Sequence, residues 1–265
     1  MRIATLSLIA LLPLCSQADL MNDNSTWALK SQIFFQSDFG STTPYSYFFD
    51  SGALETGATA APSVAGGAET ETMTGVANNW SYSELFSEQD DMDASFPNGP
   101  YSITSNGTPT TAEVAIGVSP TYADAYPDAI PALDSVTGSS FVDGKLSIPF
   151  TTSQISFDWN DPGGSVTDVL LTLFDSDYQL IFYGLYDGDA QSTGLIDFPF
   201  ASAGDYEAEL IFMNKTTDQV VDGVDVYGGF YHGTALEIEV VPEQSSYAVL
   251  CGLAAFIVLI ARRRS

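Results

Sequence analysis

The sequence predicts an all-β protein, an antiparallel β-sandwich with two lobes. Several segments alternate apolar and polar residues with the period of a strand that has one solvated face. Turn signals recur at a spacing of roughly 8–12 residues, which is typical of sandwiches. The chain has 265 residues, 45% of them hydrophobic and 12% aromatic, which is too apolar for a disordered acidic chain.

In the N-terminal part of the chain the strand signals are separated by long polar stretches. The strands expected there are 28–36, 45–49, 101–104 and 112–118. One short helix is expected near 82–93. Residues 53–72 are rich in Ala, Gly, Thr and Ser, so they form either a flexible linker or weak strands.

The C-terminal part carries the clearest strand patterns. The expected strands are 155–159, 169–174, 178–183, 206–212 and 236–240, and the second and third of these form a hairpin. Trp159 is in phase with Phe157 and Ile155, which predicts a core position. We divide the exported body into an N-terminal β-rich lobe, 19–135, and a C-terminal β-sandwich, 136–241.

The net charge of −27 arises from 34 acidic and seven basic residues. A nucleic-acid partner is excluded, because such a protein needs a basic face to neutralise phosphates. Between the two ends the only cations are Lys30, Lys145 and Lys215, so the body itself stands at −31. Cys15 and Cys251 lie in the end segments, which leaves the body without a disulfide.

Residues 1–18 have the pattern of a secretory signal peptide. Arg2 provides the charged start, residues 3–14 are almost entirely apolar, and cleavage is expected after Ala18. The alternatives are an uncleaved anchor, for which the apolar run is short, and a lipoprotein processed at Cys15.

A second apolar run lies close to the C-terminus. Tyr247 to Ala261 carries no charge and is followed by Arg262, Arg263 and Arg264. This pattern predicts a short transmembrane helix over 247–261, with the arginines as a stop-transfer signal on the cytoplasmic side.

The residues before this helix complete a recognisable tail, 242–265. Val241, Pro242 and Glu243 precede it, with Gln244 where a second proline is usual. This combination resembles the PEP-CTERM sorting domain of Gram-negative bacteria. The resemblance implies recognition by an exosortase-type membrane protease, and a context of extracellular polysaccharide. It implies a single-pass membrane intermediate followed by a cell-surface or extracellular location.

The body offers a second, shorter set of motifs. Their order is 96–101, 125–127, 155–159 and 204–210. This order resembles a module of secreted bacterial proteins. The last hundred residues resemble an immunoglobulin-like or fibronectin type III-like sandwich.

The body contains few residues of the kinds that support catalysis. His232 is the only imidazole, and no Gly-x-Ser-x-Gly elbow is present. We therefore assign no catalytic residue and expect a non-enzymatic surface or extracellular-matrix protein. A glycan hydrolase with a carboxylate pair is the least favoured alternative.

Two other ligands are considered from the residue types. Asp175, Asp177, Asp187 and Asp189 place oxygen atoms in turns, where calcium could bind, although acidic turns also serve solubility. No other cofactor is expected. A carbohydrate-binding protein is the second hypothesis, and its candidate aromatic surface patch is Tyr183, Tyr186, Tyr227 and Tyr231.

Overall fold

A computed structural model describes residues 25–53, 63–66, 70–76, 79–104, 111–118, 121–150 and 154–242. The N-terminal elements are β1 (Ser25–Asp38), β2 (Ser41–Ala53), β3 (Ser63–Ala65), β4 (Glu71–Thr72), β5 (Thr74–Val76), β6 (Asn79–Phe86), α2 (Gln89–Ser95), β7 (Gly99–Thr104) and β8 (Thr111–Ile116). The later elements are β9 (Leu133–Val136), β10 (Ser140–Val142), β11 (Lys145–Pro149), β12 (Phe157–Trp159), β13 (Asp168–Asp175), β14 (Leu180–Asp187), β15 (Gly204–Val221) and β16 (Val224–Val241).

A ten-stranded sheet organises the described part of the chain. Its main path runs β14-β13-β15-β16-β1-β2-β6-β5, and β11 joins it beside β16 with β10 at its side. Neighbours are antiparallel except that β1 and β11 both run parallel to β16. Two smaller sheets, β4-β3-β7-β8 and β12-β9, accompany the large one, which confirms the expected all-β class.

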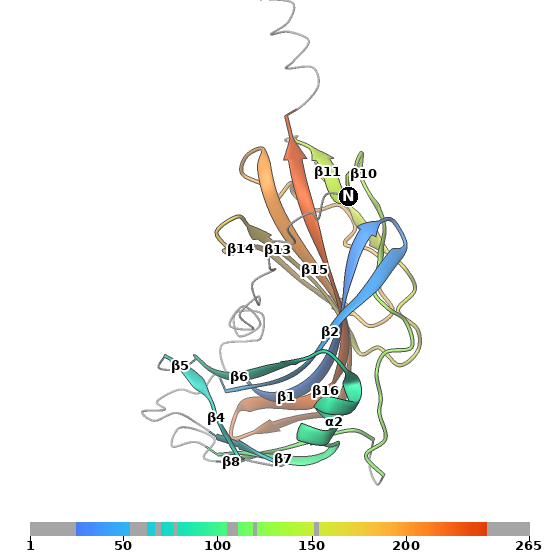
Figure 1. Ribbon diagram of the computed structural model, residues 1–265. Helices are drawn as coiled ribbons and strands as arrows, with labels where there is room; N and C mark the ends of the chain where they lie inside the picture. Colours follow the sequence, from blue (N-terminus) through green and yellow to red (C-terminus); the bar gives the residue numbers. More distant parts are fainter. Residues whose placement is uncertain are drawn as a thin grey trace, which may run out of the picture.

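Strand β16 passes through both halves of the molecule (Figure 1). It is joined to β15 by Asp222 and Gly223, whose φ angles of 54° and 83° are those of a type I′ hairpin turn. Because side chains alternate along a strand, its even-numbered residues face one side of the large sheet throughout. We call this side the inner face and the opposite side the outer face.

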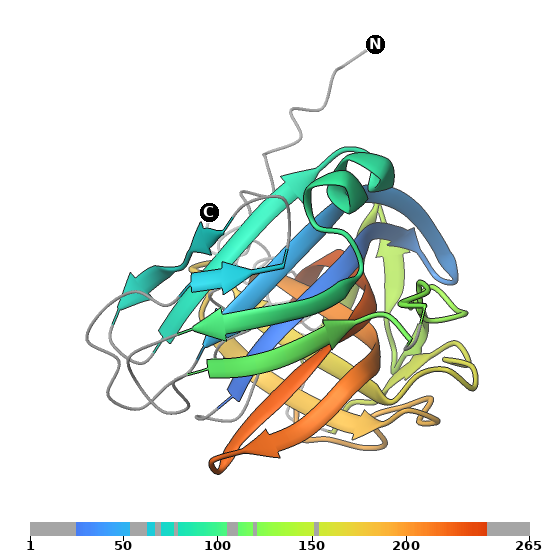
Figure 2. The same cartoon turned by 90° about the horizontal axis from the view of Figure 1, so that it is seen from below.

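The inner face carries two separate hydrophobic cores. The first lies in the half that contains β7 and β8, which cross in front of β1 and β2 in Figure 2. Val226 and Phe230 of β16 belong to this core, together with Phe49 and Tyr101. The second core includes Leu236, Ile238 and Val240 of β16, packed with residues of β11, β12, β13 and β15. Both halves therefore share one strand.

The outer face has a smaller apolar cluster of its own. It contains Trp27, Leu29, Leu170, Ile211, Met213, Tyr227 and Tyr231. All seven side chains are buried. The strands at this position are therefore apolar on both faces, unlike the one-sided alternation of the strand ends.

Most expected strands coincide with observed ones, but their lengths differ. The segments expected at 206–212 and 236–240 are the parts of β15 and β16 where apolar and polar residues alternate, and each strand has 18 residues. The expected helix near 82–93 is wrong in position, because 79–86 is strand β6, paired with β2, and the helix spans only Gln89–Ser95. The lobe boundary that we placed after residue 135 falls inside β9.

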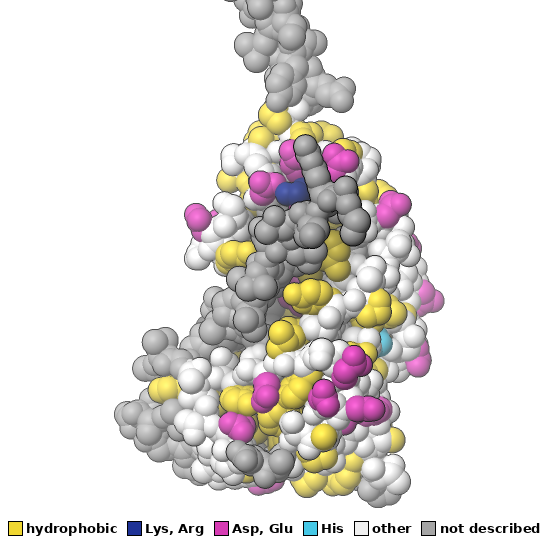
Figure 3. Space-filling model, in the orientation of Figure 1, with side chains coloured by type: hydrophobic (Ala, Val, Ile, Leu, Met, Phe, Trp, Pro, Cys, Tyr) yellow, Lys and Arg dark blue, Asp and Glu magenta, His cyan; other side chains and the backbone are white. Residues whose placement is uncertain are grey.

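Acidic side chains are scattered over the side of the molecule seen in Figure 3, with little basic surface between them. Each lysine of the described residues makes an ion pair with a carboxylate: Lys30, Lys145 and Lys215. Among the described residues no helix is long and apolar enough to cross a membrane, and the helix expected over 247–261 lies outside them.

Gly52 permits the close packing of Trp27 on the outer face. A Cβ atom at Gly52 would lie 2.0 Å from Cζ2 of the indole. We expect Gly52→Ala to lower the free energy of unfolding by about 1–3 kcal/mol or more. The added methyl group would overlap the indole ring, so the surrounding side chains would have to repack. Urea unfolding measures the loss. Gly164→Ala is the control, because its Cβ meets no atom within 4 Å; equal stability of the two variants would contradict this role.

Candidate functional site

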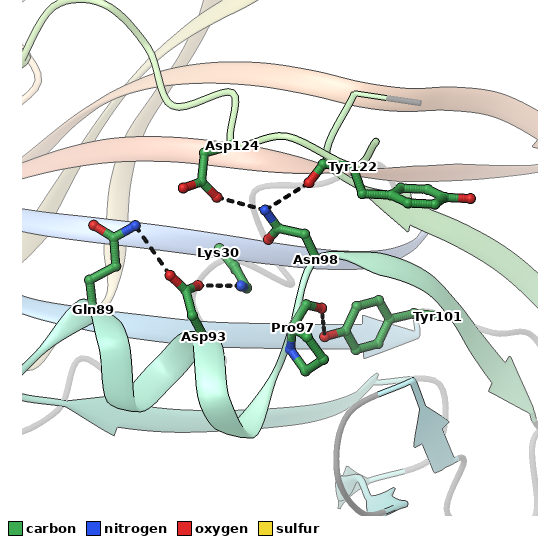
Figure 4. Close-up of polar contacts among 8 residues, drawn as sticks. All are labelled: Lys30, Gln89, Asp93, Pro97, Asn98, Tyr101, Tyr122 and Asp124. Atoms are coloured by element: carbon green, nitrogen blue, oxygen red, sulfur yellow. Dashed lines mark hydrogen bonds and ion pairs between the residues drawn. The ribbon is translucent and has the colours of Figure 1, made fainter. Parts of the chain in front are cut away.

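The described residues hold two features that could carry function. One is a polar cluster around Lys30, buried on the inner face between the large sheet and α2 (Figure 4). The other is a hollow on the outer face, lined by β1, β13, β14, β15 and β16.

Lys30 is the centre of the polar cluster. It lies on β1 beside Phe49 of β2, and its side chain is fully buried. Its Nζ lies 2.5 Å from Oδ1 of Asp93, a residue of α2 whose side chain is 34% exposed. The other oxygen of Asp93 accepts a hydrogen bond from Nε2 of Gln89 at 3.4 Å. The ion pair of Lys30 with Asp93 links α2 to β1 of the large sheet.

The segments on either side of β7 and β8 add polar contacts to the cluster. Nδ2 of Asn98 donates to the carbonyl of Tyr122 at 3.0 Å and to Oδ1 of Asp124 at 2.6 Å. The hydroxyl of Tyr101 donates to the carbonyl of Pro97 at 2.6 Å. Figure 4 shows these groups around Lys30. The motif 96–101 is thus hydrogen-bonded to the loop that leads to the motif 125–127.

The charge state of Lys30 reflects opposing effects. Burial lowers its pKa, because it disfavours the ammonium form. The hydrogen bond and charge of Asp93, and the charge of Asp124, act in the opposite direction, and burial outweighs them. In the sequence, Lys30 stands out only as one of the three cations of the body. Its place within the apolar run of β1 was the available signal that it is buried.

The hollow on the outer face encloses about 210 Å³. Its lining residues are Ser25, Asp168, Leu170, Tyr183, Leu185, Met213, Lys215, Asp218, Asp225 and Tyr227. Nζ of Lys215 lies 3.2 Å from Oδ2 of Asp168 and 5.5 Å from the ring centre of Tyr227. The hollow therefore combines aromatic and aliphatic surface with both signs of charge.

Two buried carboxyl groups belong to the same outer face. Asp50 accepts a hydrogen bond from Nε1 of Trp27 at 3.1 Å, and its Oδ1 has no hydrogen-bond partner. Burial raises the pKa of Asp50 to about 7 and that of Glu209 to about 7. The hydrogen bond from Trp27 opposes the shift at Asp50, and the neighbouring charge of Glu207 adds to it at Glu209.

The expected tyrosine patch is only partly at the surface. Tyr183 is 41% exposed, and Tyr186 is half-buried against Trp159, which is buried as predicted. Tyr227 and Tyr231 are 5% and 1% exposed, so the prediction that they are surface residues is wrong. They are odd-numbered residues of β16 and pack on the outer face with Trp27 and Leu29.

The four candidate calcium ligands lie at opposite ends of one hairpin. Asp175 and Asp177 are at the turn between β13 and β14, where Oδ1 of Asp175 accepts the backbone N–H groups of Asp177 and Gln179. Asp187 pairs with Asp168 at the other end, and Asp189 follows it. Among the described residues, no three His, Cys, Asp or Glu side chains are grouped so that they could hold a metal ion.

The remaining predicted positions lie toward the two ends of the chain. Val241 is the last residue of that strand, and the carbonyl of Val241 accepts a hydrogen bond from the N–H of Phe150 at 2.7 Å. Pro242 follows and is exposed. Ala18, Glu243, Tyr247, Ala261, Arg262, Arg263 and Arg264 lie outside the described residues.

His232 has a packing role in this structure. It is 8% exposed, Nδ1 lies 3.1 Å from the carbonyl oxygen of Ala129, and the ring stacks on Tyr126. Burial lowers its pKa, which favours the neutral ring.

No protein-family model matches the chain, and no curated protein matches it. Among solved structures the chain is similar to one described as "Biofilm associated protein - BSP domain", with 15% identity and a TM-score of 0.21. The match covers 82% of this chain and 29% of that chain. A TM-score at this level supports no argument about fold or function.

The buried carboxyl groups predict an unusual dependence of stability on pH. Their folded pKa values lie above the ordinary values of 3.8 and 4.5, so the folded state keeps protons that the unfolded state releases. Stability should fall as pH rises from about 4 to about 7, by about 1.4 kcal/mol per pH unit and per group, and level off above that.

Asp50→Asn should reduce this slope by about half, because the amide still accepts the hydrogen bond from Trp27 but does not titrate, whereas Glu209 still does. Urea unfolding between pH 4 and 8 measures the effect, and the variant should be more stable than the wild type at pH 8. Asp189→Asn, at an exposed turn, is the control and should keep the wild-type slope. An unchanged slope in Asp50→Asn would contradict the assignment.

Proposed function

We propose that this chain is a non-enzymatic exported protein of the cell surface or extracellular matrix, sorted through a PEP-CTERM-like tail. Its processing partner is then an exosortase-type membrane protease. The route runs through the secretory pathway and a single-pass membrane intermediate anchored by the helix expected over 247–261.

The observation that carries this proposal is the junction between the body and the tail. β16 remains hydrogen-bonded as far as Val241, and the next residue, Pro242, is exposed. Proline cannot continue the ladder as a donor and favours an extended chain. A protease that cuts beyond this proline therefore removes no residue from the sheet, and the body remains folded after release from the membrane.

The charge of the body is consistent with this destination. The net charge of −31 over 19–243 keeps copies of the body apart in solution. Acidic side chains are spread over the surface seen in Figure 3 rather than gathered at one site. Such a surface stays hydrated and repels anionic polymers, which suits a protein of an external layer.

Deletion of 243–265 should prevent the chain from reaching the location of the full-length protein, because the body keeps its last strand but loses the sorting address. Cell fractionation in a Gram-negative host that has an exosortase measures the location, and intact mass reports both cleavages. Replacement of Pro242 and Glu243 by Ala should leave the tail attached to the body.

Glu239→Ala is the matched control, because it changes an exposed acidic residue of β16 just before the motif. It should be sorted and cleaved as the wild type is. Identical location of the truncated and full-length chains would overturn the proposed role of the tail.

The second candidate function is carbohydrate binding, and the hollow on the outer face is the observation that favours it. Tyr183 and Tyr227 provide aromatic surface there, and Lys215, Asp168 and Asp218 provide polar groups. Sites of this kind combine apolar area with a few directed polar groups. The immunoglobulin-like character of the last hundred residues belongs to this proposal, and no specific observation favours a glycan hydrolase.

Tyr183→Ala should abolish any binding to a glycan array, because it removes an exposed ring from the hollow. Tyr178→Ala is the control, since Tyr178 is 42% exposed, as Tyr183 is at 41%, but does not line the hollow. Binding that is lost equally in both variants, or absent in the wild type with and without calcium, would contradict this second function.

A further inference from the structure

The contact between Lys30 and Asp93 places an amine directly against a carboxyl group. Nζ of Lys30 lies 2.5 Å from Oδ1 of Asp93, and the side chain of Lys30 has no exposed surface. By contrast, the ion pair of Lys215 with Asp168 is longer, at 3.2 Å, and both of its side chains are partly exposed. Lys145 is more exposed still.

The surroundings of Lys30 are apolar and rigid. Phe49 lies beside it in the sheet, and Phe49, Met92, Phe96 and Tyr101 belong to one buried core. The rings of Phe49 and Phe96 stack with centroids 3.9 Å apart. This packing fixes the backbone of α2 against β2, the neighbour of β1, and so keeps the amine and the carboxyl group close to each other.

We propose that Lys30 and Asp93 condense into an intramolecular amide that links β1 to α2. The neutral Nζ attacks Cγ of Asp93, a C–N bond forms, and a C–O bond of the carboxyl group breaks. The ammonium form of Lys30 and the carboxylate of Asp93 together contain the atoms of one amide and one water. The reaction therefore needs no oxidant, reductant or further co-reactant.

Three physical features favour the step. Burial favours the neutral amine, which is the nucleophile. Fixed proximity replaces the entropy that two free reactants would lose. The product also removes a buried ammonium group, which is costly to keep out of water, and replaces it with a neutral amide.

Asp124 is the group that we assign to proton transfer. Its charge acts on Lys30, and its carboxylate is positioned by Nδ2 of Asn98 at 2.6 Å. It can take a proton from the attacking nitrogen and return it to the oxygen that leaves as water. Asp124→Ala should slow the reaction, with the same product.

Mass spectrometry of the full chain, denatured and reduced after purification, tests the proposal. The wild type should contain one branched peptide that joins the segments around Lys30 and Asp93, at their summed mass less one water. Trypsin should not cut after Lys30 in this product. Lys30→Arg should show no linked peptide, because it keeps the positive charge but is a far weaker nucleophile.

The remaining variants separate this reaction from other losses of water. Asp93→Ala should give no link, whereas Asp93→Asn should give the wild-type product by loss of ammonia. Lys215→Arg is the matched control and should leave the link intact. A ring closure at an Asp-Gly pair would also lose water, but it would survive in Lys30→Arg and would not join two peptides. Folded wild-type protein with a free Lys30 and an unlinked Asp93 would overturn the proposal and leave an ion pair only.

Discussion

The register of the β15–β16 hairpin is the constraint on which both halves of the molecule depend. A slip of one residue would turn Val226, Phe230 and Ile238 to the outer face and bring Tyr227 and Tyr231 to the inner one. The turn at Asp222 and Gly223 fixes this register at one end. Because both inner cores and the outer cluster use side chains of the same strand, none of them can be repacked independently.

Ionisable groups are buried on both faces of the sheet near β1. Lys30 lies on the inner face beside Phe49, while the next residue of β2, Asp50, lies on the outer face beside Leu29. The two side chains point to opposite faces of the sheet and do not form an ion pair. Lys30 contacts Asp93 of α2, and Asp50 accepts a hydrogen bond from Trp27 of β1. The pKa of each group therefore depends on the packing of its own face of the sheet.

The sequence was sufficient for the fold class but not for the arrangement. Alternation identified strands such as β12 and the later part of β16, because one of their faces is polar. It missed the extent of β1, β15 and β16, where Trp27, Leu29 and Tyr227 make the second face apolar as well. The parallel pairing of β1 with β16 has no local signal. The Lys30 cluster was missed for the same reason, since its members come from segments far apart in the chain.

The parallel pairing of β1 with β16 sets the order of events during biosynthesis. β1 is the first of the described strands to leave the ribosome, and β16 is the last of them. β1 can pair with β2 early, but its other edge stays open until nearly the whole body has emerged. Long-range pairing of this kind folds slowly. A chain that closes its central sheet last stays incompletely folded for most of the time that its synthesis takes.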